Sequence, residues 1–252
     1  MMKHFLCVLT TALLLSLNAT GQDTTSYKPV QGDHGFAVNI NGLLQNINLS
    51  PYSNQMGQPT IFYRYYIKDD LALRAGVGLQ SNWYSMQRTD SVGASQVRRD
   101  TSFSQPNLSL SLGIEKHLGN SPRFDPYVGV EAALSAIGKQ RISSFTIVND
   151  TTGEDITEME YIEDGGAQIS LRGLAGFNFF VYPKLSIGAE YGFMCYFATQ
   201  GGDWRRTTIT TPISGVTTST RQLGSNRTQQ LGYEVDNTVT LTLSYFFSRK
   251  DS

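Results

Sequence analysis

Six charged residues, three arginines and three glutamates, are the side chains in this sequence best placed to do chemistry together. They stand singly within alternating, largely apolar segments, at Arg64, Arg74, Glu115, Glu131, Arg172 and Glu190. Each falls on the polar parity of its segment, so a β-strand would turn it away from the apolar neighbours. Opposite charges that share an enclosed space must pair and hydrogen-bond. The pattern therefore predicts a network of ion pairs rather than a catalytic centre.

Catalytic and metal-binding patterns are weak in comparison. The histidines and cysteines of the chain are His4, His34, His117, Cys7 and Cys195. No histidine has an evident nucleophile partner, and no Cys/His cluster has the spacing of a zinc site. The acidic stretch 150–155 lacks the regular oxygen-ligand spacing of a calcium loop and is interpreted as a solvated tip. We expect no catalytic residues, no metal, no cofactor and no enzymatic activity.

The N-terminus has the layout of an export signal. Lys3 and His4 precede a mostly apolar run over residues 5–17, and small residues follow near Gly21. This run is too short for a membrane helix, and its flanks suit a secretory signal. We predict a signal peptide over 1–21, a short periplasmic tether over 22–33 and one further domain over 34–252. Loss of Cys7 with the signal would leave Cys195 alone, without an intrachain disulfide partner.

Segments with a two-residue hydrophobic period recur along the predicted domain. In residues 71–80 the odd positions are apolar, whereas the even positions include Arg74, Gly76 and Gly78. Such alternation is typical of a β-strand with one apolar face. Eight segments are strand candidates, over residues 36–44, 60–67, 71–80, 108–115, 126–137, 167–182, 185–193 and 239–247. Each is long enough to cross a bilayer as a tilted strand.

The connections between these segments alternate strictly in length. Short ones occur near residues 67–70, 117–125 and 182–184, and long polar ones span 49–58, 85–103, 140–165 and 199–235. Outer-membrane β-barrels have short periplasmic turns and long extracellular loops, whereas a soluble β-sandwich, the alternative, has no reason for this alternation. Within the last long connection, a hairpin is expected around Ser214 and Gly215.

Composition agrees with a barrel whose apolar side chains face lipid and whose polar side chains face the lumen. Aromatic residues gather near the segment ends, as in the belts that lie at membrane interfaces. Eight strands leave a lumen just wide enough for side chains to fill, so the six charged residues are expected to plug it. The net charge of -1 argues against a nucleic-acid partner.

The eight amphipathic segments and the aromatic final segment, residues 239–247, resemble small Gram-negative outer-membrane barrels of the OmpA/OmpX type, or a PorT-like barrel. The resemblance implies an eight-stranded antiparallel up-and-down transmembrane barrel in the outer membrane, surrounded by lipid and monomeric. It also implies that the barrel-assembly machinery recognises the final segment.

The function predicted first is structural or surface-interacting, with the loops 85–103, 140–165 and 199–235 contacting an extracellular ligand. A narrow channel or transporter for small solutes is the first alternative. An assembly factor of a secretion system, by resemblance to PorT-type barrels, is the second.

Overall fold

The computed structural model describes residues 27–41, 60–92, 95–150, 153–235 and 239–248. The predicted signal peptide and the predicted connection 49–58 lie outside these residues. The described part forms eleven strands, and none of it forms a helix long and apolar enough to cross a membrane. The strands are β1 (His34–Asn39), β2 (Ile61–Lys68), β3 (Leu71–Val92), β4 (Ser95–His117), β5 (Phe124–Ile137), β6 (Gln140–Asp150), β7 (Gly153–Glu163), β8 (Gly166–Tyr182), β9 (Leu185–Thr211), β10 (Thr218–Val235) and β11 (Thr240–Phe247).

Eight of these strands close into a ring. The order is β1, β2, β3, β4, β5, β8, β9 and β11, and β11 returns to pair with β1. Every pairing is antiparallel, and the first and last strands meet where His34 lies opposite Phe247. The eight ring strands overlap the eight predicted segments, which confirms the all-β antiparallel expectation. A count of eight strands in all is not confirmed, because β6, β7 and β10 add to it.

The two-residue period places opposite chemistry on the two sides of the ring. On β4, inward Ser109, Ser111 and Glu115 are buried, whereas outward Leu110 and Leu112 are 55% and 71% exposed. The same belt of exposed apolar side chains continues around the ring at Leu73, Val77, Val130, Leu134, Ile169, Leu171, Ile187, Phe193, Leu243 and Tyr245. The apolar surface of this ring therefore lies on its outside, as a lipid environment requires.

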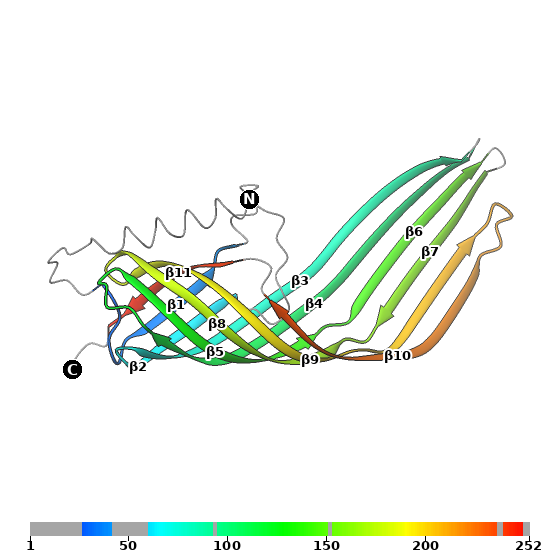
Figure 1. The fold of residues 1–252 in the computed structure, drawn as a ribbon. Helices are drawn as coiled ribbons and strands as arrows, with labels where there is room; N and C mark the ends of the chain where they lie inside the picture. The colour runs from blue at the N-terminus through cyan, green and yellow to red at the C-terminus, as the bar shows by residue number, and fades with distance from the viewer. Residues whose placement is uncertain (1–26, 42–59, 93–94, 151–152, 236–238, 249–252) are drawn as a thin grey trace.

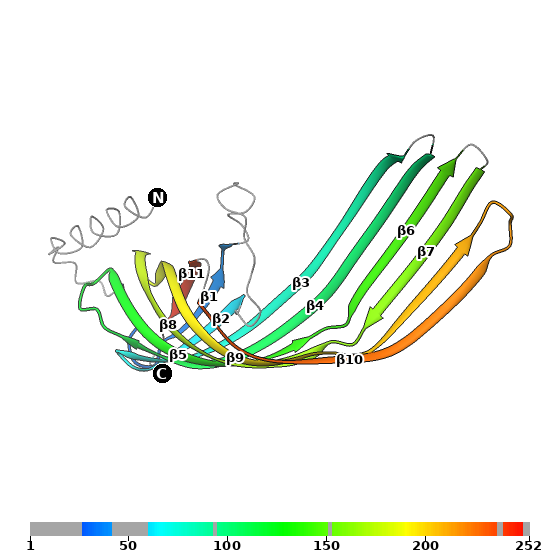
Figure 2. The same cartoon turned by 45° about the vertical axis from the view of Figure 1, so that its right-hand side comes forward.

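Beyond one end of the ring, six strands form an open sheet, here called the arm. It consists of residues 81–92 of β3, 95–106 of β4, all of β6 and β7, 200–211 of β9 and 218–228 of β10. Their order across the sheet is β3, β4, β6, β7, β9 and β10. Figures 1 and 2 show the arm rising well beyond the ring and curving away from it.

The prediction of long loops over 85–103, 140–165 and 199–235 was wrong in its secondary structure. Nearly all of these residues belong to strands, paired without a register shift along β3–β4, β6–β7 and β9–β10. Polarity suggested loops, but a sheet with water on both faces carries polar residues at both parities. The hairpin expected near Ser214 does form, with the Gly215 N–H donating to the Pro212 carbonyl at 2.8 Å and Gly215 at φ +79°.

Substitutions at two apolar residues of similar exposure, Leu112 and Val216, test which surface of the protein faces lipid. Leu112→Arg, in the belt, is expected to destabilise the folded protein in lipid vesicles by about 2–4 kcal/mol, because the guanidinium enters hydrocarbon. Val216→Arg, in the arm hairpin and 68% exposed, should leave stability unchanged. Denaturant unfolding in vesicles measures both. Equal tolerance of the two substitutions would mean that the belt faces water.

Candidate functional site

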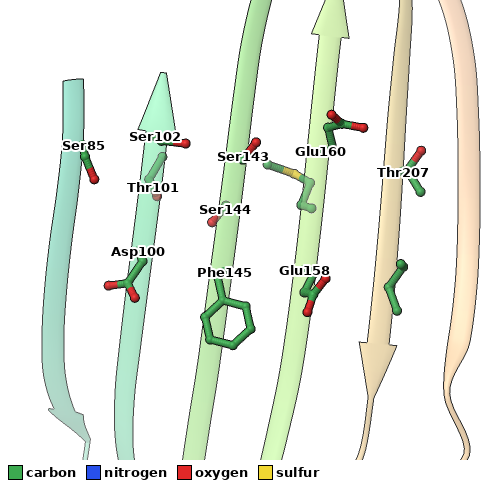
Figure 3. Close-up of a pocket in the computed structure, with 12 residues that line it drawn as sticks. Ser85, Asp100, Thr101, Ser102, Ser143, Ser144, Phe145, Glu158, Glu160 and Thr207 are labelled. Atoms are coloured by element: carbon green, nitrogen blue, oxygen red, sulfur yellow. The ribbon is translucent and has the colours of Figure 1, made fainter. Parts of the chain in front are cut away.

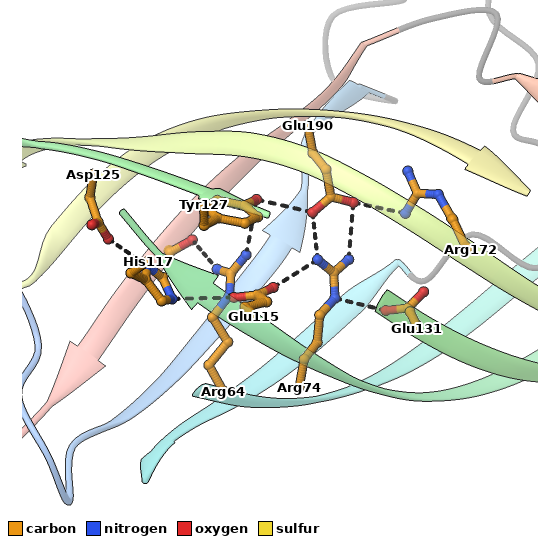
Figure 4. A network of polar contacts seen from close by, with 10 residues as sticks. Arg64, Arg74, Glu115, His117, Asp125, Tyr127, Glu131, Arg172 and Glu190 are labelled. Atoms are coloured by element: carbon orange, nitrogen blue, oxygen red, sulfur yellow. Dashed lines mark hydrogen bonds and ion pairs between the residues drawn. The ribbon is translucent and has the colours of Figure 1, made fainter. Parts of the chain in front are cut away.

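The six predicted charged residues all lie inside the ring, buried in its lumen. They come from six different strands, with Arg64 on β2, Arg74 on β3, Glu115 on β4, Glu131 on β5, Arg172 on β8 and Glu190 on β9, and each is between 0% and 4% exposed. Their positions follow from parity, since each strand directs the even or the odd set inward. Figure 4 shows them converging from opposite walls of the lumen.

Arg74 is the centre of the network. Its guanidinium contacts three carboxylates, with Nη1 2.9 Å from Glu115 Oε1 and 2.5 Å from Glu190 Oε2, and Nε 2.8 Å from Glu131 Oε2. The guanidinium also lies over the Phe62 ring, 3.9 Å from its centroid. One planar cation thus ties together strands β3, β4, β5 and β9 across the lumen.

Two further arginines complete the pairing. Arg64 Nε donates to Glu115 at 2.8 Å, and Arg172 Nη1 donates to Glu190 at 2.8 Å. The Tyr127 hydroxyl donates to Glu190 at 3.0 Å. Three positive and three negative side chains therefore meet in one cluster, so their formal charges cancel.

Glycines make room for these large side chains. A Cβ at position 192 would lie 2.6 Å from Arg172 Nε, and one at position 113 would lie 2.6 Å from the Val130 carbonyl oxygen. Both positions face inward, where two strands and a charged side chain approach closely. A substitution at either glycine would displace a network residue or the strand behind it.

Sequence reasoning missed three members of the network. His117, expected in a surface turn, instead ends β4 and is 6% exposed. Its Nδ1 lies 2.7 Å from Asp125 Oδ2, and its Nε2 lies 3.7 Å from Glu115 Oε2. Tyr127 and Asp125 also face inward. The sequence parity could have indicated their inward orientation, because His117 shares the parity of Glu115, and Asp125 and Tyr127 share that of Glu131.

The described part of the predicted tether, residues 27–33, packs against the ring instead of hanging free. Tyr27 lies in an apolar cluster with Tyr66, Ala72, Phe180 and Phe246 at the end of the lumen opposite the arm. The many polar residues of this segment suggested a free tether, but the aromatic side chain of Tyr27 anchors it. The segment therefore covers the end of the lumen at which the short turns lie.

Polar contacts hold this covering segment in place. Lys28 Nζ lies 3.0 Å from Asp125 Oδ1, and Arg123 donates to the Tyr27 hydroxyl at 2.8 Å. Since Asp125 also contacts His117, a continuous series of polar contacts joins the segment to the central network. In the exposed turn between β2 and β3, hydrogen bonding from Lys116 holds the pKa of Asp70 below its ordinary value.

Other candidate ligands do not assemble. Within the described ranges, no group of three or more His, Cys, Asp or Glu side chains is arranged to hold a metal ion. His34 contacts the Tyr63 hydroxyl at 2.5 Å, and Cys195 is exposed. The lumen network is therefore the candidate functional site.

Removing the central cation should destabilise the fold strongly. Arg74→Met is expected to lower the free energy of unfolding by about 3–5 kcal/mol, because carboxylates remain buried without their partner. Arg88→Met removes an exposed pair with Asp90 in the arm and should change it by less than about 1 kcal/mol. Denaturant unfolding in detergent micelles measures both. Similar small losses would show that the network carries no stability.

Comparison with known proteins identifies the family to which the chain belongs. It matches the family described as "Outer membrane protein beta-barrel domain" over residues 9–247. Among curated proteins, no relative matches. One similar solved structure is an outer membrane channel from Pseudomonas putida F1, at 10% identity and a TM-score of 0.18, covering 90% of this chain and 100% of that chain. That likeness is too low to carry an argument. The family match covers most of the sequence, and the chain belongs to the outer membrane protein β-barrel domain family.

Proposed function

We propose that this protein is a non-enzymatic, monomeric eight-stranded outer-membrane barrel with a closed lumen, which acts through its extracellular arm. The observation that carries the proposal is the buried, charge-balanced network around Arg74. A conducting pore needs a hydrated lining, whereas these side chains are almost wholly inaccessible. The barrel itself would then serve as an anchor in the membrane.

A second closure supports this proposal. The cluster around Tyr27 lies at one end of the lumen, and the ion-paired network lies deeper inside. A solute would have to pass both in series. The aromatic edge of β11, at Tyr245 and Phe247, suits recognition by the barrel-assembly machinery when the ring closes.

The arm supports a role in surface interaction. It extends from the end of the ring opposite the short turns, and by the usual topology of outer-membrane barrels that end is extracellular. Six paired strands make a stiff, two-sided surface rather than a set of separate loops. Both histidines of the described chain, His34 and His117, lie at the opposite end of the ring, away from this surface.

Conductance tests the closed lumen. Wild-type protein refolded into planar bilayers is expected to be silent. Arg74→Ala combined with Glu190→Ala should leak, because both charges leave the lumen together, and adding Tyr27→Ala should increase the leak. The exposed pair Arg88→Ala with Asp90→Ala is the matched control and should stay silent. Stable conductance in the wild type would instead make the protein a channel.

Removal of the β6–β7 hairpin tests the role of the arm. Ile137 of β5 already lies opposite Gly166 of β8, so a short turn can replace residues 139–164 without breaking a ring pairing. The shortened protein is expected to keep the heat-dependent gel migration of a folded barrel. Bacteria that carry the full chain are expected to adhere to a host or abiotic surface, and bacteria that carry the shortened protein should lose that adhesion. Unchanged adhesion would remove the arm from the proposed function.

A further inference from the structure

A groove of about 530 Å³ crosses one face of the arm. Two adjacent cross-strand rows supply most of its lining (Figure 3). One row is Ser85, Ser102, Ser143, Glu160 and Thr207, and the next is Asp100, Phe145, Glu158 and Ile209. At the usual strand spacing, the groove crosses β3, β4, β6, β7 and β9 over about 19 Å. It can therefore hold an extended ligand.

Phe145 provides the one aromatic ring of this lining. It lies directly between Asp100 and Glu158 in the cross-strand register and is partly exposed. Its ring is thus a small apolar platform with a carboxylate on either side. Such a combination suits a ligand whose apolar face and polar groups are closely interleaved.

The charges of the groove are largely compensated from within the arm. Asp100 pairs with Arg98 at 2.9 Å, and Glu160 lies 4.0 Å from Arg141 and 3.9 Å from Arg205. Because both signs of charge are interspersed, the groove does not favour a strongly charged ligand. Its carboxylates and arginines instead act as acceptors and donors for neutral hydroxyl groups.

The hydroxyl row extends this hydrogen-bonding surface. Ser85, Ser102, Ser143 and Thr207 each offer an O–H that can both donate and accept. A sugar ring presents the matching chemistry, with C–H groups on its face and hydroxyls at its rim. A cationic peptide would find most carboxylates of the groove already paired with arginines, and the side chains of an apolar peptide would make no hydrogen bonds to the hydroxyl row.

We infer that this groove binds a neutral oligosaccharide chain, stacked on Phe145 and hydrogen-bonded by the two rows. The inference rests on the proposed surface-interaction function and names its ligand class. Glu158 would accept from sugar hydroxyls beside the ring, and Ser102 and Ser143 would contact the neighbouring part of the chain.

The test uses the full-length protein in detergent micelles or nanodiscs, with dextran, mannan and maltoheptaose as neutral probes and oligolysine as a cationic one. At least one neutral probe should bind. Phe145→Ala should weaken that binding about tenfold or more, whereas Phe145→Trp should preserve it. Thr146→Ala, on the same strand but the opposite face, is the matched control and should bind as the wild type does. Gel migration of each variant confirms that it has folded.

The salt dependence of binding and a charge-removing substitution distinguish a bound saccharide from a bound cation. Binding of a neutral saccharide should stay constant over an about tenfold rise in NaCl concentration, and Glu158→Gln should retain most of it because the amide oxygen still accepts. Binding of oligolysine alone, abolished by salt and by Glu158→Gln, would overturn the inference. Failure of every neutral probe would overturn it too. If adhesion still depends on the β6–β7 hairpin in that case, the proposed function stands and only the ligand class is wrong.

Discussion

The whole architecture depends on one constraint, which is that a strand in lipid must find hydrogen-bond partners along both of its edges. The pairing of β11 with both β1 and β9 meets that constraint by closing the ring. Once the ring is closed, the alternation along each strand leaves only two environments. Most apolar side chains of the spanning segments take the lipid side, and their charged side chains are directed into a narrow interior, which they share with rings such as Phe62. The charged network is a consequence of closure as much as of the residues themselves.

That interior accepts arginine and glutamate because it brings them together in equal numbers. Arg74 reaches three carboxylates, and two of them, Glu115 and Glu190, also pair with a second arginine, Arg64 and Arg172 respectively. Planar guanidinium groups suit this role, since several donors leave one side chain in different directions. The network therefore joins walls of the ring that backbone pairing does not connect. It also explains why glycines at 113 and 192 occupy inward positions beside it.

The ring could be predicted from the sequence because lipid imposes one-sided alternation, as residues 71–80 and 108–115 illustrate. The parity of Arg74 and Glu115 follows from the same rule. The arm could not be predicted this way, because a sheet with water on both faces leaves no periodic signal in Thr, Ser and Ile. His117 was missed for another reason, since its short distance from a turn concealed that β4 continues to it. Which carboxylate pairs with which arginine depends on the register, and a single sequence does not specify that.

The strand β9 runs without interruption from the ring into the arm, over Leu185–Thr211. β3, β4 and β10 also continue from the ring into the arm, because residues 229–235 of β10 lie beside residues 193–199 of β9, so four strands and their ladders cross this boundary. In a β-sheet the hydrogen bonds are perpendicular to the strands, so a pull along the strands loads many of them in shear at once. The arm is therefore mechanically continuous with its anchor. A load applied at its tip would reach the ring as tension along β3, β4, β9 and β10.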